Sequence, residues 1–293
     1  MVVFLFLLVT IGTAGSNVIY KLAGSPEKKE RFSTNQFYFL YLGISACVYC
    51  VLMIIQEEWP SLTTLICGTV AGIGLSAAAL CYGKALQCGP YTISAAMFNY
   101  SSFLVIVYSA LILQEQISPL RIAGLVVLMG LVYLIVDCSQ KDNTRKQPNS
   151  HWLIYILAVL LLNSVVRFIL RYQSVQMLGE DNGMMFVYFC TASLTSLIFC
   201  RGEKASWPIR ITDLRAALPL ASLMALAVGV STWAQMKLPQ LGVDASIQYP
   251  IQCSGTIFSG ALVGWLFFKE KLPKRLYLLL VLSVLVIFGI YQF

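Results

Sequence analysis

The chain has 293 residues, of which 58% are hydrophobic and 11% are charged, and its formal net charge is +7. An average soluble domain carries roughly 25% charged residues, so this composition excludes an ordinary soluble domain, which could not cover so much apolar surface. The basic residues lie in short segments between apolar stretches instead of forming one exposed basic face, which argues against a nucleic-acid partner.

The chain is organised as a series of apolar stretches separated by polar or charged residues. A helix needs about 20 apolar residues to cross a bilayer. Stretches of this length cover residues 1–22, 36–56, 62–83, 90–113, 119–137, 151–171, 183–200, 214–236, 243–268 and 275–293. Because backbone groups in lipid must find partners within their own segment, we expect ten transmembrane helices in an all-α membrane protein. We interpret the first stretch as a retained helix, since no basic segment precedes it.

The basic residues also predict an orientation in the membrane. Of the 20 Lys and Arg residues, all but Arg121, Arg167, Arg171 and Lys237 lie in or next to the first, third, fifth, seventh and ninth connections. Cytoplasmic loops carry the excess of positive charge. The distribution therefore places the odd-numbered connections in the cytoplasm and both termini outside.

An internal repeat relates the two halves of the chain. The segment "KALQCGPYTISAAMFNYSS" (84–102) aligns without a gap with "KLPQLGVDASIQYPIQCSG" (237–255). Matching apolar runs then end at Glu115 and Glu270. A unit with five crossings enters the membrane upside down when it is repeated, and such inverted repeats are typical of secondary transporters.

We therefore predict two inverted five-helix repeats. The first covers residues 1–137 and the second covers residues 151–293. The polar segment 138–150 would be the linker between them.

Each predicted repeat carries a narrow polar stripe at helical spacing. The stripes consist of Ala95, Asn99, Ser102, Ile106 and Ser109 in the fourth stretch, and of Gln248, Gln252, Gly255 and Ser259 in the ninth. Two interpretations stay open. Small residues and amides can pack and bond between helices, or the stripes can line a polar cavity.

The sixth stretch carries Asn163, Arg167 and Arg171 on one helical face. A charge inside the membrane is costly and usually functional, but a long side chain near a helix end can also reach the interface. If Arg167 faces a cavity, it favours an anionic group such as a carboxylate or phosphate.

Other polar and aromatic residues complete the candidate substrate-binding set. Polar groups near the end of the first stretch are as ambiguous as Arg167, and aromatic residues within helices can stack on a ring, face lipid or belong to the core. The full candidate set is Asn17, Tyr20, Tyr82, Asn99, Tyr100, Arg167, Trp233, Gln248 and Gln252.

Two short motifs are better explained by helix packing than by chemistry. Cys47 and Cys50 form a CxxC pair, but within an apolar helix and not at the strand–helix turn of a redox site. Gly68 and Gly72 form a GxxxG motif, which we expect to pack inside the bundle. The oligomeric state stays open.

The sequence contains no enzyme signature, and we predict neither a cofactor nor a metal. The phosphate-binding pattern GxxxxGK[ST] is absent, and the single histidine, His151, has no metal-ligating neighbours. Every Asp and Glu lies in a connection or near a helix end, which disfavours a proton relay inside the membrane. We interpret Glu115 and Glu270 as residues that stabilise the N-termini of the fifth and tenth helices.

Three segments give the chain a resemblance to a known family. They are "GSNVIYKLA" (15–23), "ALQCGPYTISAAMFNYSSFLVIVYSALILQEQIS" (85–118) and "LPQLGVDASIQYPIQCSGTIFSGALVGWLFFKEKLP" (238–273). The chain resembles the ten-helix EamA-type branch of the drug/metabolite transporter superfamily over nearly its full length. The resemblance implies a carrier whose cavity is lined by helices one to four and six to nine, so that Asn99 and Gln252 would face it.

Two features depart from the family pattern. The short four-helix multidrug members use a glutamate in their first helix, and this first helix has none. Family members usually keep both termini in the cytoplasm, whereas the charge distribution here favours the opposite orientation.

Together, these features predict a multi-pass protein of the cell membrane that works as a secondary transporter. Its substrate would be a small polar metabolite of amino-acid, sugar, nucleotide or drug type, moved by alternating access, with export as one option. The alternative is a membrane scaffold or receptor whose polar stripes only pack helices.

Overall fold

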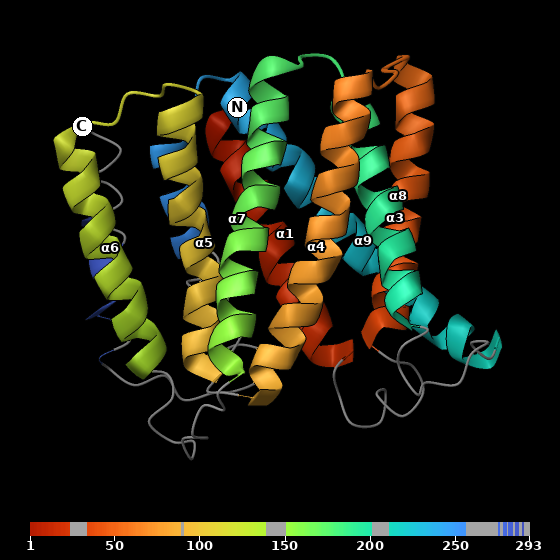
Figure 1. Ribbon diagram of the computed structural model, residues 1–293, viewed down its shortest axis with the longest axis horizontal. Coiled ribbons are helices and arrows are strands. Elements are labelled where there is room, and N and C mark those ends of the chain that lie inside the picture. The colour runs from red at the N-terminus through yellow and green to blue at the C-terminus, as the bar shows by residue number, and fades with distance from the viewer. Residues whose placement is uncertain are drawn as a thin grey trace. The chain divides into compact units, whose positions relative to one another are not determined.

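The computed structural model describes residues 1–23, 34–88, 91–138, 151–200 and 211–255, and scattered positions from 275 to 289. Within these residues every regular element is a helix and none is a strand. The complete helices are α1 (Val2–Ala23), α3 (Thr34–Gln56), α4 (Leu62–Cys88), α5 (Tyr91–Ile112), α6 (Pro119–Cys138), α7 (Trp152–Gln176), α8 (Asp181–Cys200) and α9 (Ile211–Gln240) (Figure 1). Residues 245–255 are helical as well.

These helices coincide with the first eight predicted stretches, and residues 245–255 belong to the ninth. The all-helical class is therefore confirmed. The tenth stretch is described only at scattered positions, so the ten-helix inverted repeat and its boundaries at 137 and 151 stay predictions.

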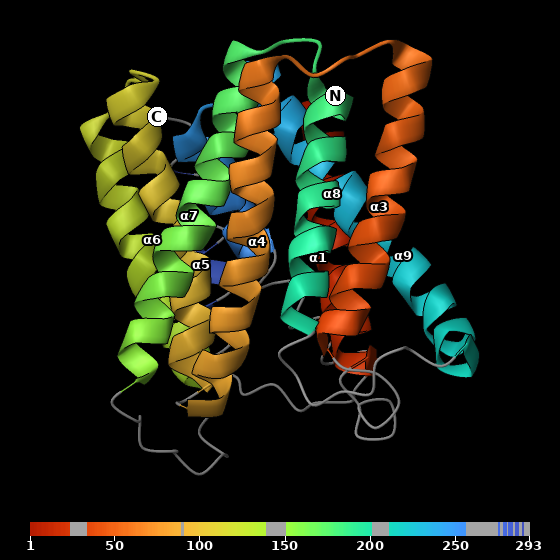
Figure 2. The ribbon, with the colours of Figure 1, turned by 45° about the vertical axis from the view of Figure 1, so that its right-hand side comes forward.

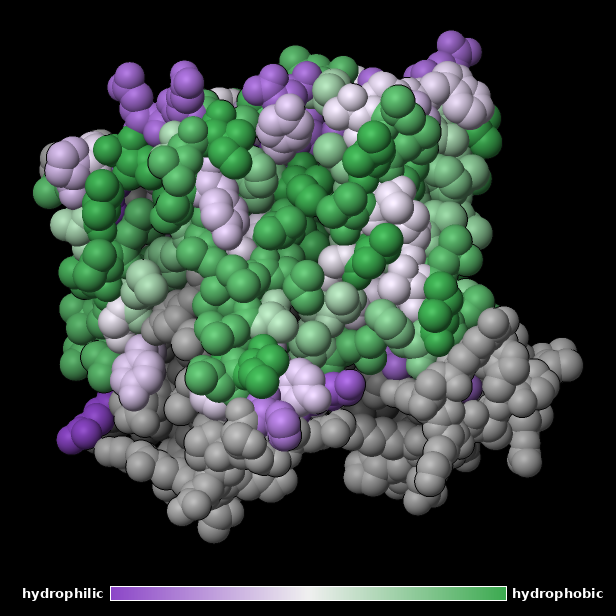
Figure 3. Space-filling view, in the orientation of Figure 1, coloured by the Kyte–Doolittle hydropathy of each residue, from purple (hydrophilic) through white to green (hydrophobic). Residues whose placement is uncertain are grey.

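Several helices have the length and composition of membrane spans. Among the described residues, five reach that length, at Asn35–Gln56, Leu62–Ala85, Trp152–Gln176, Asp181–Cys200 and Ala217–Gln240. Shorter apolar helices occur at Val2–Ser16, Ser101–Ile112 and Pro119–Leu131. Figure 3 shows the result on one face, where hydrophobic residues cover the helices and hydrophilic residues gather near their ends. An integral membrane protein follows from this pattern.

The described helices fall into two compact units that do not follow the order of the sequence. The first unit comprises residues 1–76 and 169–240, and the second comprises residues 77–168 and 241–293. Each unit thus contains segments from both halves of the chain. The chain passes from one unit to the other within α4, within α7 and at the turn after α9.

In the first unit, α3 packs along α8, and α1 packs along α9. Glycines bring helices close together. A Cβ atom at Gly72 on α4 would clash with Thr191 Oγ1 and would lie 2.6 Å from the carbonyl oxygen of Tyr188 on α8. At Gly68 it would lie 2.8 Å from Cγ1 of Val187. The GxxxG motif of α4 therefore packs inside the protein, as the sequence predicts.

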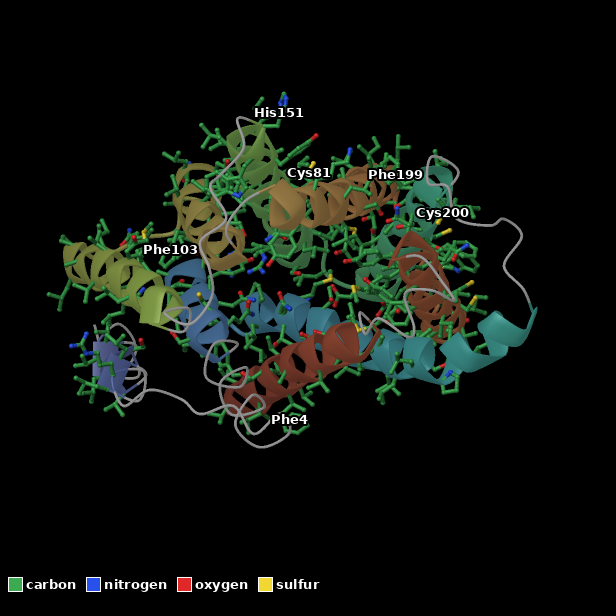
Figure 4. All side chains as sticks on the ribbon, turned by 90° about the horizontal axis from the view of Figure 1, so that it is seen from below. Phe4, Cys81, Phe103, His151, Phe199 and Cys200 are labelled. Atoms are coloured by element: carbon green, nitrogen blue, oxygen red, sulfur yellow. The ribbon has the colours of Figure 1, made fainter. Side chains whose placement is uncertain are left out.

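In the second unit, α5 packs on α6 around a small apolar core. Its buried residues are Val105, Ile106, Leu125, Ala245 and Tyr249. Phe103, labelled in Figure 4, packs against this core from α5. The contacts join the helix at 245–255 to α5, although more than 130 residues separate them in the sequence.

Serines begin two of the helices in the same way. Ser61 Oγ accepts a hydrogen bond from Thr64 N at 3.3 Å at the start of α4, and Ser118 Oγ accepts one from Arg121 N at 3.2 Å at the start of α6. Each serine satisfies a backbone N–H that has no partner within the helix. The preceding turns contain Glu57 and Gln114, both at φ 56°.

Glu115 stabilises a different helix from the one expected. Its Oε2 accepts a hydrogen bond from Ala245 N at 2.8 Å, so it lies at the N-terminus of the helix at 245–255 and not at that of α6. The N-terminus of α6 uses Ser118 instead. Along the chain Glu115 is nearest to the start of α6, but the fold brings the N-terminus of the helix at 245–255 within hydrogen-bonding distance of its carboxylate. Glu270 lies outside the described residues.

Candidate substrate-binding site

The candidate site is built on one face of α7 in the second unit. Asn163 and Arg167 are four residues apart, so a helix of 3.6 residues per turn places both on the same side. Asn163 is 6% exposed and Arg167 is half-buried. The helix extends to Gln176, nine residues beyond Arg167, whereas the sequence predicted an end near 171.

The longer helix weakens one interpretation of Arg167. Nine residues correspond to about 13 Å of helix, which is more than the extended arginine side chain can span. The guanidinium also points to a neighbouring helix, because Arg167 Nη1 donates a hydrogen bond to Ser102 Oγ on α5 at 2.6 Å. Arg167 is therefore held within the unit and does not extend toward the end of α7.

Two adjacent serines on α5 accept hydrogen bonds from the polar side chains of α7. Ser101 Oγ accepts a hydrogen bond from Asn163 Nδ2 at 2.6 Å, parallel to the bond between Ser102 and Arg167. Both serines are buried, at 0% and 3% exposure. An amide and a guanidinium thus meet two hydroxyl groups away from water, where each of these hydrogen bonds is strong.

The helix at 245–255 closes the site from a third side. Tyr249 OH donates a hydrogen bond to the carbonyl oxygen of Arg167 at 3.3 Å. One turn further along, the buried Cys253 lies within electrostatic reach of Arg167. The site therefore combines one positive charge with amide and hydroxyl groups.

The predicted site residues are divided between the two units. Arg167, Tyr82, Gln248 and Gln252 belong to the second unit, where Gln248 is 1% exposed and Gln252 is 6% exposed. Trp233, on α9, belongs to the first unit. Asn17, Tyr20, Asn99 and Tyr100 lie on α1 and α5, but their side chains are outside the described part of the structure.

Some residues of the site were missing from the predicted set. Ser101 has no equivalent in the stripe of α5, because it is one residue away from Ser102 and would face another direction on an isolated helix. Asn163 shares a helical face with Arg167 in the sequence pattern, but neither Asn163 nor Tyr249 belongs to the predicted set. Their common signal is a polar group within an apolar helix.

A second polar cluster lies in the first unit, at the start of α8. Asp181 is 1% exposed and forms an ion pair with Lys237 of α9 at 2.5 Å. Gln240 Nε2 donates to both carboxylate oxygens of Asp181, each at 2.9 Å. These bonds connect α9 to α8. Because the positive and negative charges neutralise each other, the cluster has no net charge with which to attract a ligand.

The fold defines a class of protein, an integral helical membrane protein. Its candidate site holds an arginine among polar side chains within apolar helices, where a charge is rare and usually functional. Residues 1–137 match the family model of the EamA-like transporter family. The resemblance to the drug/metabolite transporter superfamily is confirmed by this match, which is consistent with a membrane transporter of that type.

A solved structure supports the same fold. It is titled "Crystal structure of protein" and has a TM-score of 0.67 at 16% sequence identity, covering 99% of this chain and 95% of its own. At this identity the likeness concerns the fold alone. No curated protein matches the chain.

Proposed function

We propose that the protein is a secondary carrier that moves a small polar metabolite with an anionic group across the cell membrane by alternating access. The observation that carries the proposal is the position of Arg167, more than two turns inside α7 and bonded to Ser102. A cation at this depth is costly and is usually kept for function.

The chemistry of the site favours an anionic substrate. A guanidinium can donate two parallel hydrogen bonds to a carboxylate or a phosphate, and it stays charged in any environment. Asn163 and the two serines add neutral hydrogen-bonding groups beside it. Among amino acids, sugars, nucleotides and drugs, this set favours amino acids and phosphorylated compounds.

A substrate would replace bonds that already exist in the site. Ser101 and Ser102 are side-chain acceptors, and their hydroxyl groups can rotate toward a new partner. A substrate carboxylate could therefore take over the donors of Arg167 and Asn163 without leaving the serines unsatisfied. A scaffold would gain nothing from such an exchangeable arrangement, because an apolar contact packs helices without the cost of burying a charge.

The first test is the thermal stability of the purified protein against a panel of carboxylates, phosphates, sugars and organic cations. A ligand that binds the folded state raises the melting temperature by mass action. We expect an anionic compound to raise it, and we expect Arg167→Ala to lose the effect while Arg167→Lys keeps part of it.

Lys84→Ala provides the control, because Lys84 is an exposed cation of the same unit that lies 5.6 Å from the ring centre of Tyr155. It should keep the response to the ligand. The same compounds would then be tested for flux in proteoliposomes. If no compound raises the melting temperature and none crosses the membrane, the carrier proposal is wrong and the scaffold interpretation replaces it.

A further inference from the structure

A polar cluster in the first unit joins the start of α4 to the end of α7. Glu180, in the connection between α7 and α8, accepts hydrogen bonds from Ser61 N at 2.9 Å and from the hydroxyl group of Thr64. Thr64 Oγ1 in turn accepts a hydrogen bond from Gln173 Nε2 at 2.7 Å. Figure 2 shows the two connections, α3–α4 and α7–α8, at the same end of their helices.

Hydrogen bonding keeps the carboxylate of Glu180 charged. Burial alone would raise its pKa, but the bonds from Thr64 and from Ser61 outweigh burial and hold the pKa below its ordinary value. One negative charge is thus present in the cluster at neutral pH.

The side-chain oxygen of Gln173 is not satisfied by the hydrogen bonds within the cluster. Its side chain is 0% exposed, and its Oε1 atom is buried without any hydrogen-bond partner. A buried carbonyl oxygen without a donor is costly, and such an atom in a native protein calls for a ligand or an ordered water. Nε2 of the same amide contacts Thr64, so the unbonded oxygen lies beside the cluster.

We propose that Glu180, Thr64 and Gln173 bind an alkali-metal cation, with sodium as the expected ion. Carboxylate, hydroxyl and amide oxygens are the ligands that hard cations take in proteins. Half a turn of the Gln173 amide exchanges Nε2 with Oε1, two atoms of nearly equal size, and places a second oxygen beside Thr64 Oγ1.

The charge of the cluster selects a monovalent ion. Glu180 supplies one negative charge, which a monovalent cation neutralises, whereas a divalent cation would leave an excess positive charge in the cluster. Calcium usually takes six to eight oxygen ligands, several of them carboxylates. The site has only one carboxylate.

The surroundings favour a cation as well. The last carbonyl groups of α7 have no further helical turn to bond with, and they form the negative end of its dipole. Lys237 does not compete for the site, because Asp181 neutralises it. Arg171 is two residues before Gln173 and so projects about 200° away around α7.

If the protein is the carrier that we propose, this site would couple substrate movement to a cation gradient. Only this role depends on the proposed function, because binding of the ion can be measured without any substrate. A protein that binds the ion but transports nothing would overturn the carrier proposal and leave the cation site intact.

The test is the melting temperature of the purified full-length protein in sodium, potassium or choline chloride at constant ionic strength, with equilibrium binding of radioactive sodium measured in parallel. In sodium, or in potassium if the site accepts the larger ion, we expect a saturable rise of about 3 °C over choline. Thr64→Val and Glu180→Gln should abolish the rise and the bound sodium.

Glu57→Gln is the matched control, because Glu57 is an exposed carboxylate in the connection before α4 and takes no part in the cluster. It should keep the full response. Glu180→Gln changes a residue in a connection, so it remains informative if Thr64→Val does not fold. The proposal is wrong if the three salts give the same melting temperature and no sodium binds, or if Thr64→Val and Glu180→Gln keep the response.

Discussion

The two compact units use their buried polar side chains in different ways. In the first unit, Ser76 and Tyr49 donate to backbone carbonyls of a neighbouring helix, Ser76 to Ala192 at 2.7 Å and Tyr49 to Gly229 at 2.9 Å. In the second unit, Asn163 and Arg167 donate to the hydroxyl groups of serines.

The two kinds of hydrogen bond differ in whether a ligand can replace one of the partners. A backbone carbonyl is fixed in its helix, so a bond to it ties two helices together and has no obvious replacement. A serine hydroxyl rotates and can donate or accept, so its partner can be replaced by a ligand. The bonds of Ser76 and Tyr49 thus fix helix contacts in the first unit, whereas Ser101 and Ser102 of the second unit offer groups that a substrate could use.

The largest effect should come from filling the closest helix contact of the first unit. Gly72→Ala places a methyl group 2.6 Å from the carbonyl oxygen of Tyr188 and 2.9 Å from Ala192 N, so α4 and α8 must separate. We expect a loss of about 1–3 kcal/mol or more, measured as a lower melting temperature and a lower yield of folded protein.

Gly83 is the matched control on the same helix. It lies in the part of α4 that belongs to the second unit, and a Cβ atom there would meet nothing within 4 Å. Gly83→Ala should be neutral or stabilise by up to about 1 kcal/mol, because alanine is the better helix former. Equal losses of stability in Gly72→Ala and Gly83→Ala would show that close helix packing does not distinguish the first unit from the second.

The next largest effect should come from the buried ion pair. Asp181→Asn removes the partner of Lys237, and since Asp181 is 1% exposed while Lys237 is one-third exposed, we expect a loss of about 2 kcal/mol. In the second unit, Arg121 pairs with Asp244 at 2.9 Å, and Asp244 is 42% exposed. Asp244→Asn should therefore cost about 0–1 kcal/mol. Chemical denaturation of both variants in detergent would measure the difference, and a larger loss for Asp244→Asn would contradict it.

A smaller effect is expected from removing one hydroxyl group in each unit. Tyr49→Phe loses the bond to Gly229 but keeps the ring stacked on Phe189 at 5.6 Å, so it should cost about 1 kcal/mol. Tyr249→Phe loses a longer bond of 3.3 Å to Arg167 and should cost a few tenths of a kcal/mol. Melting curves of both variants, recorded in the same detergent, would test this order.

The smallest effect should be a pH dependence due to Glu180. Its pKa is lower in the folded protein than the ordinary value of 4.5, so the charged form stabilises the fold above that value. This contribution is lost as the pH falls through the folded-state pKa. Between about pH 5 and pH 3, the melting temperature should fall more steeply for the wild type than for Glu180→Gln, and an identical slope would show that Glu180 is not bonded as described.

The sequence was a good guide wherever a property depended on one segment. Eight predicted stretches coincide with helices, and their limits agree to within a few residues except at the ends of α4, α7 and α9. Apolar length sets these elements, because a membrane-spanning segment must satisfy its own backbone. The packing role of Gly72 likewise follows from a local pattern, the GxxxG motif.

The site was predicted only in part. Arg167 stands out in any apolar helix, since a charge there is rare, and the spacing of Asn163 follows from the helical period. Ser101, the orientation of Tyr249 and the distant partner of Glu115 could not be predicted, because each depends on which helix becomes the neighbour. Periodicity describes the face of a helix but not what that face contacts.

The sequence by itself therefore determined that this protein is a helical membrane protein, because its composition and the length of its apolar stretches fit a lipid environment and not water. Only the tertiary structure decided that the compact units combine segments from both halves, that Arg167 meets Ser102, and that Thr64 meets both Gln173 and Glu180. These contacts join residues 65 to 116 positions apart. Helix packing brings such residues together, and no local pattern in a single sequence encodes that packing.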